Sequence, residues 1–382
     1  MSKNSNQLDN QQSFQLGNQL QILMVGGGTA GHVEPALAVA HEIKNLRADI
    51  QIKFVGTKNG LENRLVPSQN FELKLIPKVL LPRKFTPAVF IWPFQLILAV
   101  SKSIKLVSKA NLVVGFGGYA CPPIYLAAAL LRKPIYIHEA NAVKGWANKL
   151  GALFASQIYI AFASAKSRVG TFRKAKLIGM PLRAAITKNA HLSNSEKAQL
   201  RSKQIKAWGL NENHPIILVF GGSQGSRHIN EAILQSMSFF TDNQIQVVHA
   251  VGRDNALPLT TENYIPLSYI EDMASAYLAC DLVIARSGAL TCGELAVVGK
   301  YAVLVPLPIG NGEQAANAKD LESAGAAQLI ANDQFNASWL MSNFDQILQR
   351  ATNYRPNISV GKTAAAIMAE DVVEFFKNQN RK

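Results

Sequence analysis

The stretch Gly26-Gly27-Gly28-Thr29-Ala30-Gly31-His32 decides the fold, because it joins an apolar run to a run with helical character. The run at residues 22–25 predicts a strand, and the run at residues 35–43 predicts a helix. A strand, a glycine-rich turn and a helix in this order point free backbone N–H groups at an anion. The stretch therefore predicts an α/β fold with an anion-binding loop.

The same arrangement returns three times along the chain. Apolar residues 112–114 lead into GFGGY, residues 216–220 lead into GGSQGS, and residues 282–285 lead into RSGALT. In parallel sheets, ligands bind beyond the carboxyl ends of the strands, so four such loops can share one cleft. Strands alternating with helices in both halves predict two doubly wound, Rossmann-like domains that face each other across a cleft.

A chain of 382 residues is too long for one typical core, so we expect two domains. Residues 1–19 are rich in Gln, Asn and Ser, lack the apolar segment of a secretory signal, and predict a disordered leader. We expect an N-terminal domain over residues 20–184 and a C-terminal domain over residues 185–360. Residues 361–382 predict a C-terminal helix, for which packing back on the N-terminal domain is one option.

The positive charge is concentrated in the first half of the chain. The formal net charge is +14, and residues 1–183 hold 23 Lys and Arg against 7 Asp and Glu. Such an excess indicates an anionic partner: nucleic acid, an acidic lipid surface or a phosphorylated substrate. No nucleic-acid-binding motif accompanies the charge, so we expect no nucleic-acid partner.

Cysteine usage argues against a disulfide framework and against a zinc site. The chain has three cysteines, Cys121, Cys280 and Cys292, and no CxxC pair. This pattern suits a reducing compartment.

The segment over residues 79–108 combines apolar and aromatic residues with lysines. Lys102, Lys105 and Lys109 follow at helical spacing, which is typical of a membrane-surface contact. A core helix with solvated lysines fits the same pattern, and the sequence leaves both interpretations open. The apolar run at residues 88–100 is too short to span a bilayer.

The spacing of Gly26, Gly28 and Gly31 also matches the dinucleotide-binding pattern GxGxxG. That interpretation needs an acidic residue at the end of the second strand to hold a ribose. Thr57 stands in that region, so hydride transfer with a nicotinamide cofactor is disfavoured.

Six sequence motifs occur in a fixed order along the chain, and together they resemble one protein family far more specifically than any single loop does. They are GGGTAGHVEPALAVA, GFGGY, HEANAVKGWANK, GGSQGSRHIN, ARSGALTCGELA and NGEQAANA. Together they resemble the MurG family of peptidoglycan N-acetylglucosaminyltransferases, over roughly residues 20–375. The resemblance implies a GT-B fold and inverting transfer of N-acetylglucosamine (GlcNAc) from UDP-GlcNAc to the 4-hydroxyl of undecaprenyl-pyrophosphoryl-N-acetylmuramyl-pentapeptide, which turns lipid I into lipid II. It also implies a peripheral enzyme at the cytoplasmic face of the bacterial cell membrane.

The resemblance implies a set of donor-binding residues. Ser223 matches the family's diphosphate contact, Arg183 its donor-site arginine, and Glu294 the acid that binds the uridine ribose. We expect Glu294 near a helix start, where the helix dipole keeps it ionised. The full set is Thr29, Ala30, Gly31, Asn141, Arg183, Ser223, Ile270, Ala289, Leu290, Thr291, Cys292, Gly293, Glu294 and Gln314.

Two residues in or beside this set differ from the residues that the family usually has at these positions. Ala30 replaces a glycine found in many members, so the loop does not need a positive φ there. Glu313 stands beside Gln314 where some members have a second glutamine, and a carboxylate only accepts hydrogen bonds.

His32 is the first choice for the general base, since its ordinary pKa suits proton transfer at neutral pH. Orienting the acceptor, binding phosphate and capping the helix remain open as other roles. For acceptor or membrane contact we expect Tyr119, Glu139, Leu81, Phe85, Ile91 and Trp92.

The sequence predicts no cofactor and no tightly bound metal, since no DxD-like pair precedes the second wall of the cleft. It leaves the oligomeric state open. A UDP-GlcNAc 2-epimerase-like isomerase of the same fold is the alternative function, and that class has no need of a membrane patch. A binding module without activity is a third class, but His32, Ser223 and Glu294 are all present.

Overall fold

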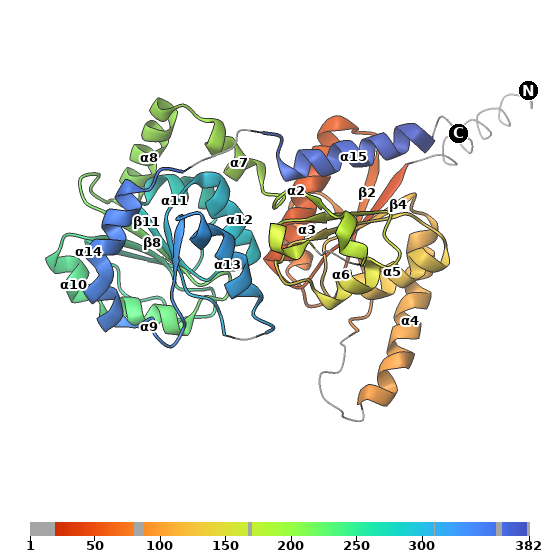
Figure 1. Cartoon of the computed structure of the whole chain (residues 1–382), viewed down its shortest axis with the longest axis horizontal. Coiled ribbons are helices and arrows are strands. Elements are labelled where there is room, and N and C mark those ends of the chain that lie inside the picture. The colour runs from red at the N-terminus through yellow and green to blue at the C-terminus, as the bar shows by residue number, and fades with distance from the viewer. Residues whose placement is uncertain (1–19, 80–87, 167–169, 309, 357–360, 380–382) are drawn as a thin grey trace, which may run out of the picture.

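The computed structural model describes residues 20–79, 88–166, 170–308, 310–356 and 361–379 (Figure 1). The predicted leader at residues 1–19 lies outside the described residues, as do Leu81 and Phe85.

The first domain is built on a parallel sheet. Its described strands follow the order β3-β2-β1-β4-β5-β6-β7. They are β1 (Gln21–Val25), β2 (Gln51–Gly56), β3 (Glu72–Leu75), β4 (Leu112–Gly115), β5 (Ile135–Glu139), β6 (Gln157–Ile160) and β7 (Lys176–Leu177). The helices and short 3₁₀ turns of this domain are α2 (Ala30–Leu46), α3 (Glu62–Ser68), α4 (Ala88–Ser108), α5 (Cys121–Leu130), α6 (Trp146–Gly151), η1 (Ala163–Ala165) and η2 (Thr171–Lys174).

The second domain repeats this plan, with the strand order β10-β9-β8-β11-β12-β13. Its strands are β8 (Ile216–Phe220), β9 (Gln246–Ala250), β10 (Tyr264–Leu267), β11 (Leu282–Ala285), β12 (Ala302–Leu304) and β13 (Ala327–Leu329). Its helices are α7 (Ala184–His191), α8 (Asn194–Trp208), α9 (Arg227–Gln235), α10 (Met237–Asp242), α11 (Met273–Ala279), α12 (Ala289–Val298), α13 (Glu313–Ser323) and α14 (Ala337–Asn353).

Both sheets are purely parallel, and every residue of β1 and of β8 is buried. Continuous apolar strands of this kind need helices on both faces, which the alternating order supplies. The prediction of two doubly wound α/β domains is therefore confirmed. The polar stretch at residues 188–203 continues α7 and forms much of α8. Ser193 and Glu196 begin α8 with a reciprocal capping box.

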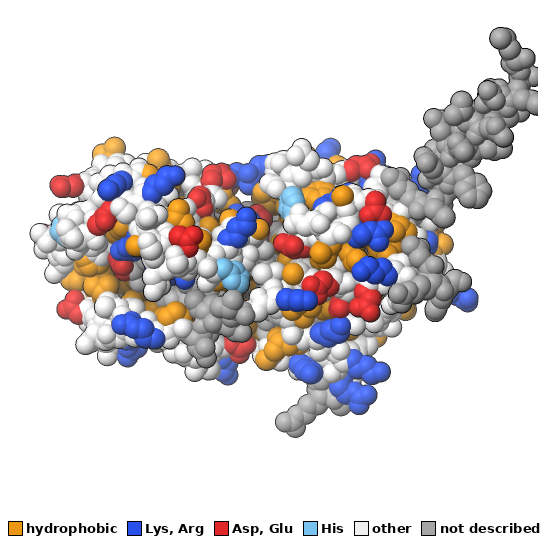
Figure 2. Space-filling view, turned by 90° about the horizontal axis from the view of Figure 1, so that it is seen from above, with side chains coloured by type: hydrophobic (Ala, Val, Ile, Leu, Met, Phe, Trp, Pro, Cys, Tyr) orange, Lys and Arg blue, Asp and Glu red, His pale blue; other side chains and the backbone are white. Residues whose placement is uncertain are grey.

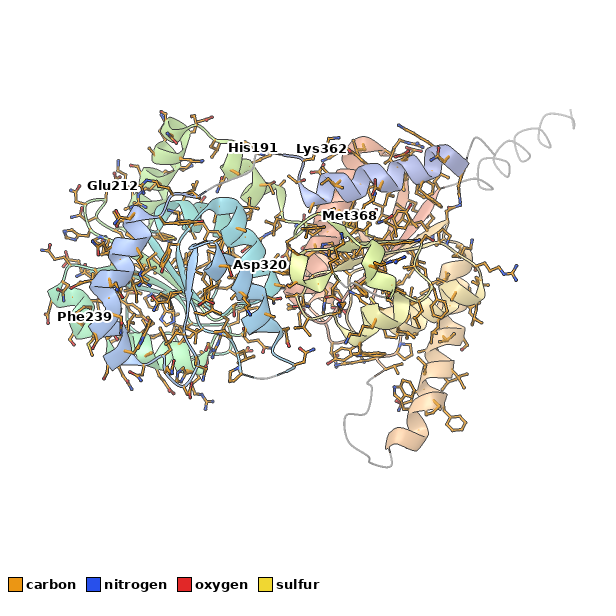
Figure 3. The ribbon with its side chains drawn as sticks, in the orientation of Figure 1. His191, Glu212, Phe239, Asp320, Lys362 and Met368 are labelled. Carbon is orange, nitrogen blue, oxygen red and sulfur yellow. The ribbon has the colours of Figure 1, made fainter. Side chains whose placement is uncertain are left out.

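The last helix, α15 (Ala364–Gln379), packs against α2 of the first domain (Figure 1). Met368, labelled in Figure 3, is fully buried, and its side chain belongs to the same apolar cluster as Val39 and Ile43 of α2. The chain thus crosses to the second domain and returns to the first.

The two domains share apolar contacts at their junction. Met180 and Leu182, in the segment that leaves β7, belong to the same buried cluster as Leu295 of α12. Ala142, after β5, lies in this cluster too. The junction is therefore packed, and it fixes where the carboxyl ends of the two sheets meet.

Helix α4 divides into a packed half and an exposed half. Ala99, Ser103 and Val107 are buried at a spacing of four residues, on the side that packs against α5. Phe94 and Leu98 are 69% and 60% exposed, and this end of α4 projects away from the domain (Figure 1). The core interpretation therefore fits only the carboxyl-terminal half of the helix.

Helix α4 is also longer than the apolar run that the sequence singles out. Residues 91–108 suffice to cross a membrane by length and composition alone, which is weak evidence because core helices of soluble proteins pass the same test. Only 17% of this window is buried inside the protein. The expectation that the run at residues 88–100 is too short to span a bilayer concerns that run alone, and α4 is longer because it continues to Ser108.

Candidate active site

A cleft of about 420 Å³ lies between the domains, at the carboxyl ends of strands from both sheets. Its walls bring together thirteen of the predicted residues, which come from seven separate segments of the chain. These are Thr29, Ala30, Gly31, His32, Asn141, Arg183, Ser223, Ile270, Ala289, Leu290, Thr291, Glu294 and Gln314.

His32 lies in the first turn of α2, and its ring is held from one side. Nδ1 is 3.1 Å from the carbonyl oxygen of Gly27 and 3.2 Å from Oγ1 of Thr29. A carbonyl only accepts hydrogen bonds, so Nδ1 carries the proton and Nε2 keeps its lone pair. Burial lowers the pKa of His32, and the Gly27 carbonyl and Glu62 oppose that shift. The ring is thus a neutral imidazole with Nε2 available as a base.

The turn before His32 takes its left-handed residue at Gly28, where φ is +91°. Ala30 has no positive φ, so the expectation that this position does not need a glycine is confirmed. The loop after β4 packs against the turn before His32, so closely that a side chain at Gly118 would overlap the Gly27 carbonyl. This loop supports the cleft but does not line it.

Arg183 joins carboxylates from the two domains. Its guanidinium lies 3.5 Å from Oε1 of Glu294 in α12 and 3.9 Å from Oε2 of Glu34 in α2. Burial lowers the pKa of Arg183, but the two carboxylates outweigh it, so the pKa is raised. The resemblance suggested that Arg183 neutralises the phosphates of the donor. In the structure its charge already pairs with the carboxylates of Glu34 and Glu294.

Glu294 is buried and lies in the second turn of α12, not at its start. Its Oε2 accepts a hydrogen bond of 3.0 Å from the Tyr277 hydroxyl. Burial raises the pKa of Glu294, and Arg183 opposes this shift. The sequence pointed to the helix dipole as the group that favours the charged form of Glu294, and the structure adds Arg183, which lowers its pKa against the effect of burial.

The amino terminus of α12 opens into the cleft without a side-chain cap. The backbone N–H groups of Ala289, Leu290 and Thr291 have no partner within the helix, so they can bind an anion. At α9, Ser226 is the N-cap residue, and its side chain accepts a hydrogen bond from Ile229 N–H. Ser223 lies in the loop before the cap, on the wall of the cleft.

The far wall is formed by the start of α13 and the loop after β5. Gln314 accepts a hydrogen bond from Leu307 N–H at 3.0 Å, which leaves its amide N–H₂ free to donate. Asn317 crosses between the domains: its Oδ1 accepts from Ala142 N–H at 2.8 Å, and its Nδ2 donates to Oδ1 of Asn141 at 3.3 Å. The sequence analysis missed Asn317, although it lies in the NGEQAANA motif.

Ile270 is buried on the wall of the cleft beside Tyr269. Cys292 and Gly293 lie away from the cleft. Cys292 is buried, and a side chain at Gly293 would come within 2.6 Å of Met180 Cβ. Gly293 thus lets the interdomain segment pack on α12, and neither residue lines the cleft.

Glu139 is also corrected by the structure. Its buried carboxylate accepts hydrogen bonds from Asn141 N–H, Gly145 N–H and the Asn148 amide. Burial raises its pKa, and these donors oppose the shift. Glu139 therefore holds the loop after β5, and it lines neither of the two interdomain clefts. Tyr119 is half-buried, and Lys78 Nζ lies 4.5 Å from its ring centre.

A second cleft of about 730 Å³ shares Thr29, Ser223 and Gln314 with the first. Its wall carries Arg64 from the first domain, and Arg227, Arg253 and Arg286 from the second. Arg286 is buried and donates to Ser226 Oγ, Asn332 Oδ1 and two carbonyls, while its Nε has no partner. The arginines make this space suitable for an anionic group.

Among the described residues, no group of three or more His, Cys, Asp and Glu side chains is placed to hold a metal ion. On the face in Figure 2, Lys and Arg side chains lie on both domains, interspersed with Asp and Glu.

The family models and the curated relatives agree. Residues 22–160 match the glycosyltransferase family 28 N-terminal domain, and residues 216–372 match the glycosyltransferase family 28 C-terminal domain. The UDP-N-acetylglucosamine–N-acetylmuramyl-(pentapeptide) pyrophosphoryl-undecaprenol N-acetylglucosamine transferase of Corynebacterium diphtheriae is 40% identical over 372 residues, which cover 95% of this chain and 99% of that protein. The protein of the same name from Thermobifida fusca is 42% identical over 86% of each chain.

Solved structures agree with this assignment. The crystal structure of Acinetobacter baumannii MurG has a TM-score of 0.69 at 28% identity, over 93% of this chain and 99% of that one. A UDP-N-acetylglucosamine 2-epimerase, with a TM-score of 0.59 at 13% identity, shares the fold alone. Since full-length relatives at 40% identity and both family 28 domains point the same way, the chain is a glycosyltransferase that belongs to the MurG family.

Proposed function

We propose that this chain transfers GlcNAc from UDP-GlcNAc to the 4-hydroxyl of the N-acetylmuramyl group of lipid I, with inversion at the sugar C1. The main observation behind the proposal is that groups suited to the donor and the proposed general base face the same cleft from opposite domains. The uncapped start of α12 and Glu294 face the cleft from one domain, and His32 with a free Nε2 faces it from the other. The names of the curated relatives supply the two substrates.

In the proposed donor pose, the vicinal hydroxyls of the ribose bond to Glu294, and uracil lies against Ile270. The diphosphate lies at the N–H groups of Ala289, Leu290 and Thr291, near Ser223. The ion pairs of Arg183 are long, so its guanidinium can still donate to the phosphates. Asn141 and Gln314 bond to the GlcNAc hydroxyls from opposite domains.

The chemical step follows from these positions. The acceptor hydroxyl oxygen attacks C1 of GlcNAc while the bond from C1 to the UDP oxygen breaks. The hydroxyl proton passes to Nε2 of His32, and the electron pair leaves on UDP. Backbone dipoles at the start of α12 stabilise the charge that develops there. The charge balance needs no metal ion, and we propose that none is tightly bound.

The second cleft supports an acceptor that is linked through a pyrophosphate. It adjoins the donor cleft, and its arginines come from both domains. An epimerase acts on UDP-GlcNAc alone, so it has no need of a second anion site or of an exposed apolar helix.

Transfer of radiolabelled GlcNAc to a short-chain lipid I analogue, with UDP release followed in parallel, tests the function. We expect labelled disaccharide and UDP to appear at equal rates. UDP release without labelled disaccharide would instead support the epimerase-like alternative. A folded sample that releases no UDP would contradict the donor assignment.

We also propose that the exposed half of α4 attaches the enzyme to the anionic cytoplasmic face of the cell membrane. Ile91, Phe94 and Leu98 are exposed at helical spacing. An apolar groove between α4 and α5 continues this surface and includes Ile97 and Leu130. The exposed Lys102, Lys105 and Lys109 are placed to meet anionic head groups.

Replacing Phe94, Ile97 and Leu98 with serine should lower binding to vesicles of phosphatidylcholine and phosphatidylglycerol by more than about tenfold, because each loses an apolar side chain that enters the lipid. Activity on a water-soluble acceptor analogue should stay within about twofold, since α4 does not line either cleft. Co-sedimentation with the vesicles measures the first quantity.

The matched control is Leu259→Ser, which removes an apolar side chain that is 88% exposed in the second domain. This variant should bind vesicles like the wild type. Unchanged vesicle binding by the α4 variant would show that the membrane contact lies elsewhere.

A further inference from the structure

A buried carboxylate lies beneath the glycine-rich loop and has no assigned role. Glu62, at the start of α3, is fully buried. Its Oε2 accepts the Gly28 N–H at 2.8 Å, and its Oε1 accepts the Thr57 N–H at 2.8 Å. No lysine or arginine among the described residues forms an ion pair with it. Neutral donors alone therefore hold this carboxylate, which is costly to bury.

Three glycines leave the space that this carboxylate fills. A side chain at Gly27 would place its Cβ 2.6 Å from Oε1 of Glu62. Side chains at Gly56 and Gly60 would overlap the same carboxyl group. Gly27 lies in the loop after β1, Gly56 ends β2, and Gly60 lies in the turn before α3. Segments that are far apart in the sequence thus form one cradle around Glu62.

One peptide group connects Glu62 to His32. The N–H of the Gly27–Gly28 peptide is that of Gly28, and it donates to Glu62. The carbonyl of the same peptide is that of Gly27, and it lies 3.1 Å from Nδ1 of His32. The carboxylate polarises the peptide, and hydrogen bonds in such a chain strengthen one another. A more negative Gly27 oxygen holds the Nδ1 proton more firmly, which keeps Nε2 as the basic nitrogen.

We infer that Glu62 is a positioning residue that fixes the tautomer and orientation of His32 through the Gly27–Gly28 peptide. The inference rests on the proposed role of His32 as the base. The carboxylate does not touch the substrate. Its negative charge stabilises the imidazolium that forms when Nε2 takes the acceptor proton. The arrangement resembles a carboxylate–histidine pair with a peptide group placed between its members.

Glu62→Gln should lower kcat about 100-fold, because general-base catalysis is worth about 100- to 10,000-fold and a misoriented base loses much of it. The KM values for UDP-GlcNAc and for the acceptor analogue should stay within about twofold, since Glu62 lines neither cleft. The control is Glu72→Gln, which removes an exposed carboxylate on β3 that pairs with Lys53 and Lys74. That variant should keep the wild-type kcat.

A double variant separates positioning from general support of the fold. If Glu62 acts through His32, then Glu62→Gln combined with His32→Ala should be no slower than His32→Ala alone. In the single variant, nitrogen NMR of labelled histidine should also show the His32 proton shared between both ring nitrogens. The inference would be overturned if the two substitutions lowered kcat by independent factors in the double variant. A folded Glu62→Gln variant with the wild-type kcat would overturn it as well.

If Glu62→Gln does not fold, Gly27→Ala provides the same test. The added Cβ displaces the end of the Glu62 side chain, and Gly27 needs no positive φ. This variant keeps every charge and should show the same loss of kcat. A wild-type enzyme without transferase activity would contradict the proposed function itself, whereas active enzyme with unaffected Glu62 and Gly27 variants would contradict only this inference.

Discussion

His32→Ala should lower kcat about 1000-fold, because it removes the group that takes the proton of the attacking hydroxyl. The dissociation constant for UDP-GlcNAc should stay within about twofold, since the donor contacts proposed for the second domain are unchanged. Steady-state transfer to a soluble lipid I analogue gives kcat, and calorimetric titration with UDP gives the binding constant.

His41→Ala is the matched control. His41 lies on the same helix, is exposed and hydrogen-bonds to Gln69, so kcat should not change. Equal losses of kcat and of UDP binding in His32→Ala would identify a structural histidine. In that case the proton acceptor would have to be sought on another wall of the cleft.

Glu294→Gln should lower kcat/KM for UDP-GlcNAc about 100-fold, since hydrogen bonds to a charged group are worth about 1.5–3 kcal/mol and the ribose offers two. Glutamine keeps the shape of the side chain but is neutral, so it also leaves Arg183 with one counter-ion fewer. The measurement is the initial rate as a function of donor concentration, at saturating acceptor.

A 2′-deoxyribose analogue of the donor shows whether the lost contact is to the ribose. The wild type should discriminate against the analogue, and Glu294→Gln should hardly distinguish the two donors. Tyr277→Phe removes the buried hydrogen bond to Glu294 without changing charge, so it should cost far less than Glu294→Gln. Equal discrimination by wild type and Glu294→Gln would contradict the ribose assignment.

Local sequence was enough to predict the fold. Residues 22–25 and 216–220 are continuous apolar runs before glycine turns. A continuous apolar run is typical of a strand that is buried on both faces of a parallel sheet. The short edge strands β3 and β13 were missed, because a few half-exposed residues carry little periodicity. The polar surface of α8 hides its apolar period in a similar way, and only the Ser193–Glu196 capping box marks its start.

The candidate site was predicted where one motif carries one contact. His32 was predicted from its place after the glycine turn, and Gln314 from the resemblance of its motif to the family. The partners of these residues were not predictable, because they come from distant segments. Glu62 reaches the loop after β1 from α3, and Glu34 reaches Arg183 from α2. Glu139 was misassigned, since the sequence shows a carboxylate at the end of a strand but not the N–H groups that bind it.

The packing of α15 on α2 has a consequence for synthesis on the ribosome. Met368, Val372 and Phe376 complete the apolar core of the first domain, although they are translated after every strand of the second domain. Domains usually fold in the order in which they emerge. Here the first domain to emerge keeps an open apolar face along α2 until the second domain has been made. Any piece that ends near residue 184 therefore lacks a wall of its own core.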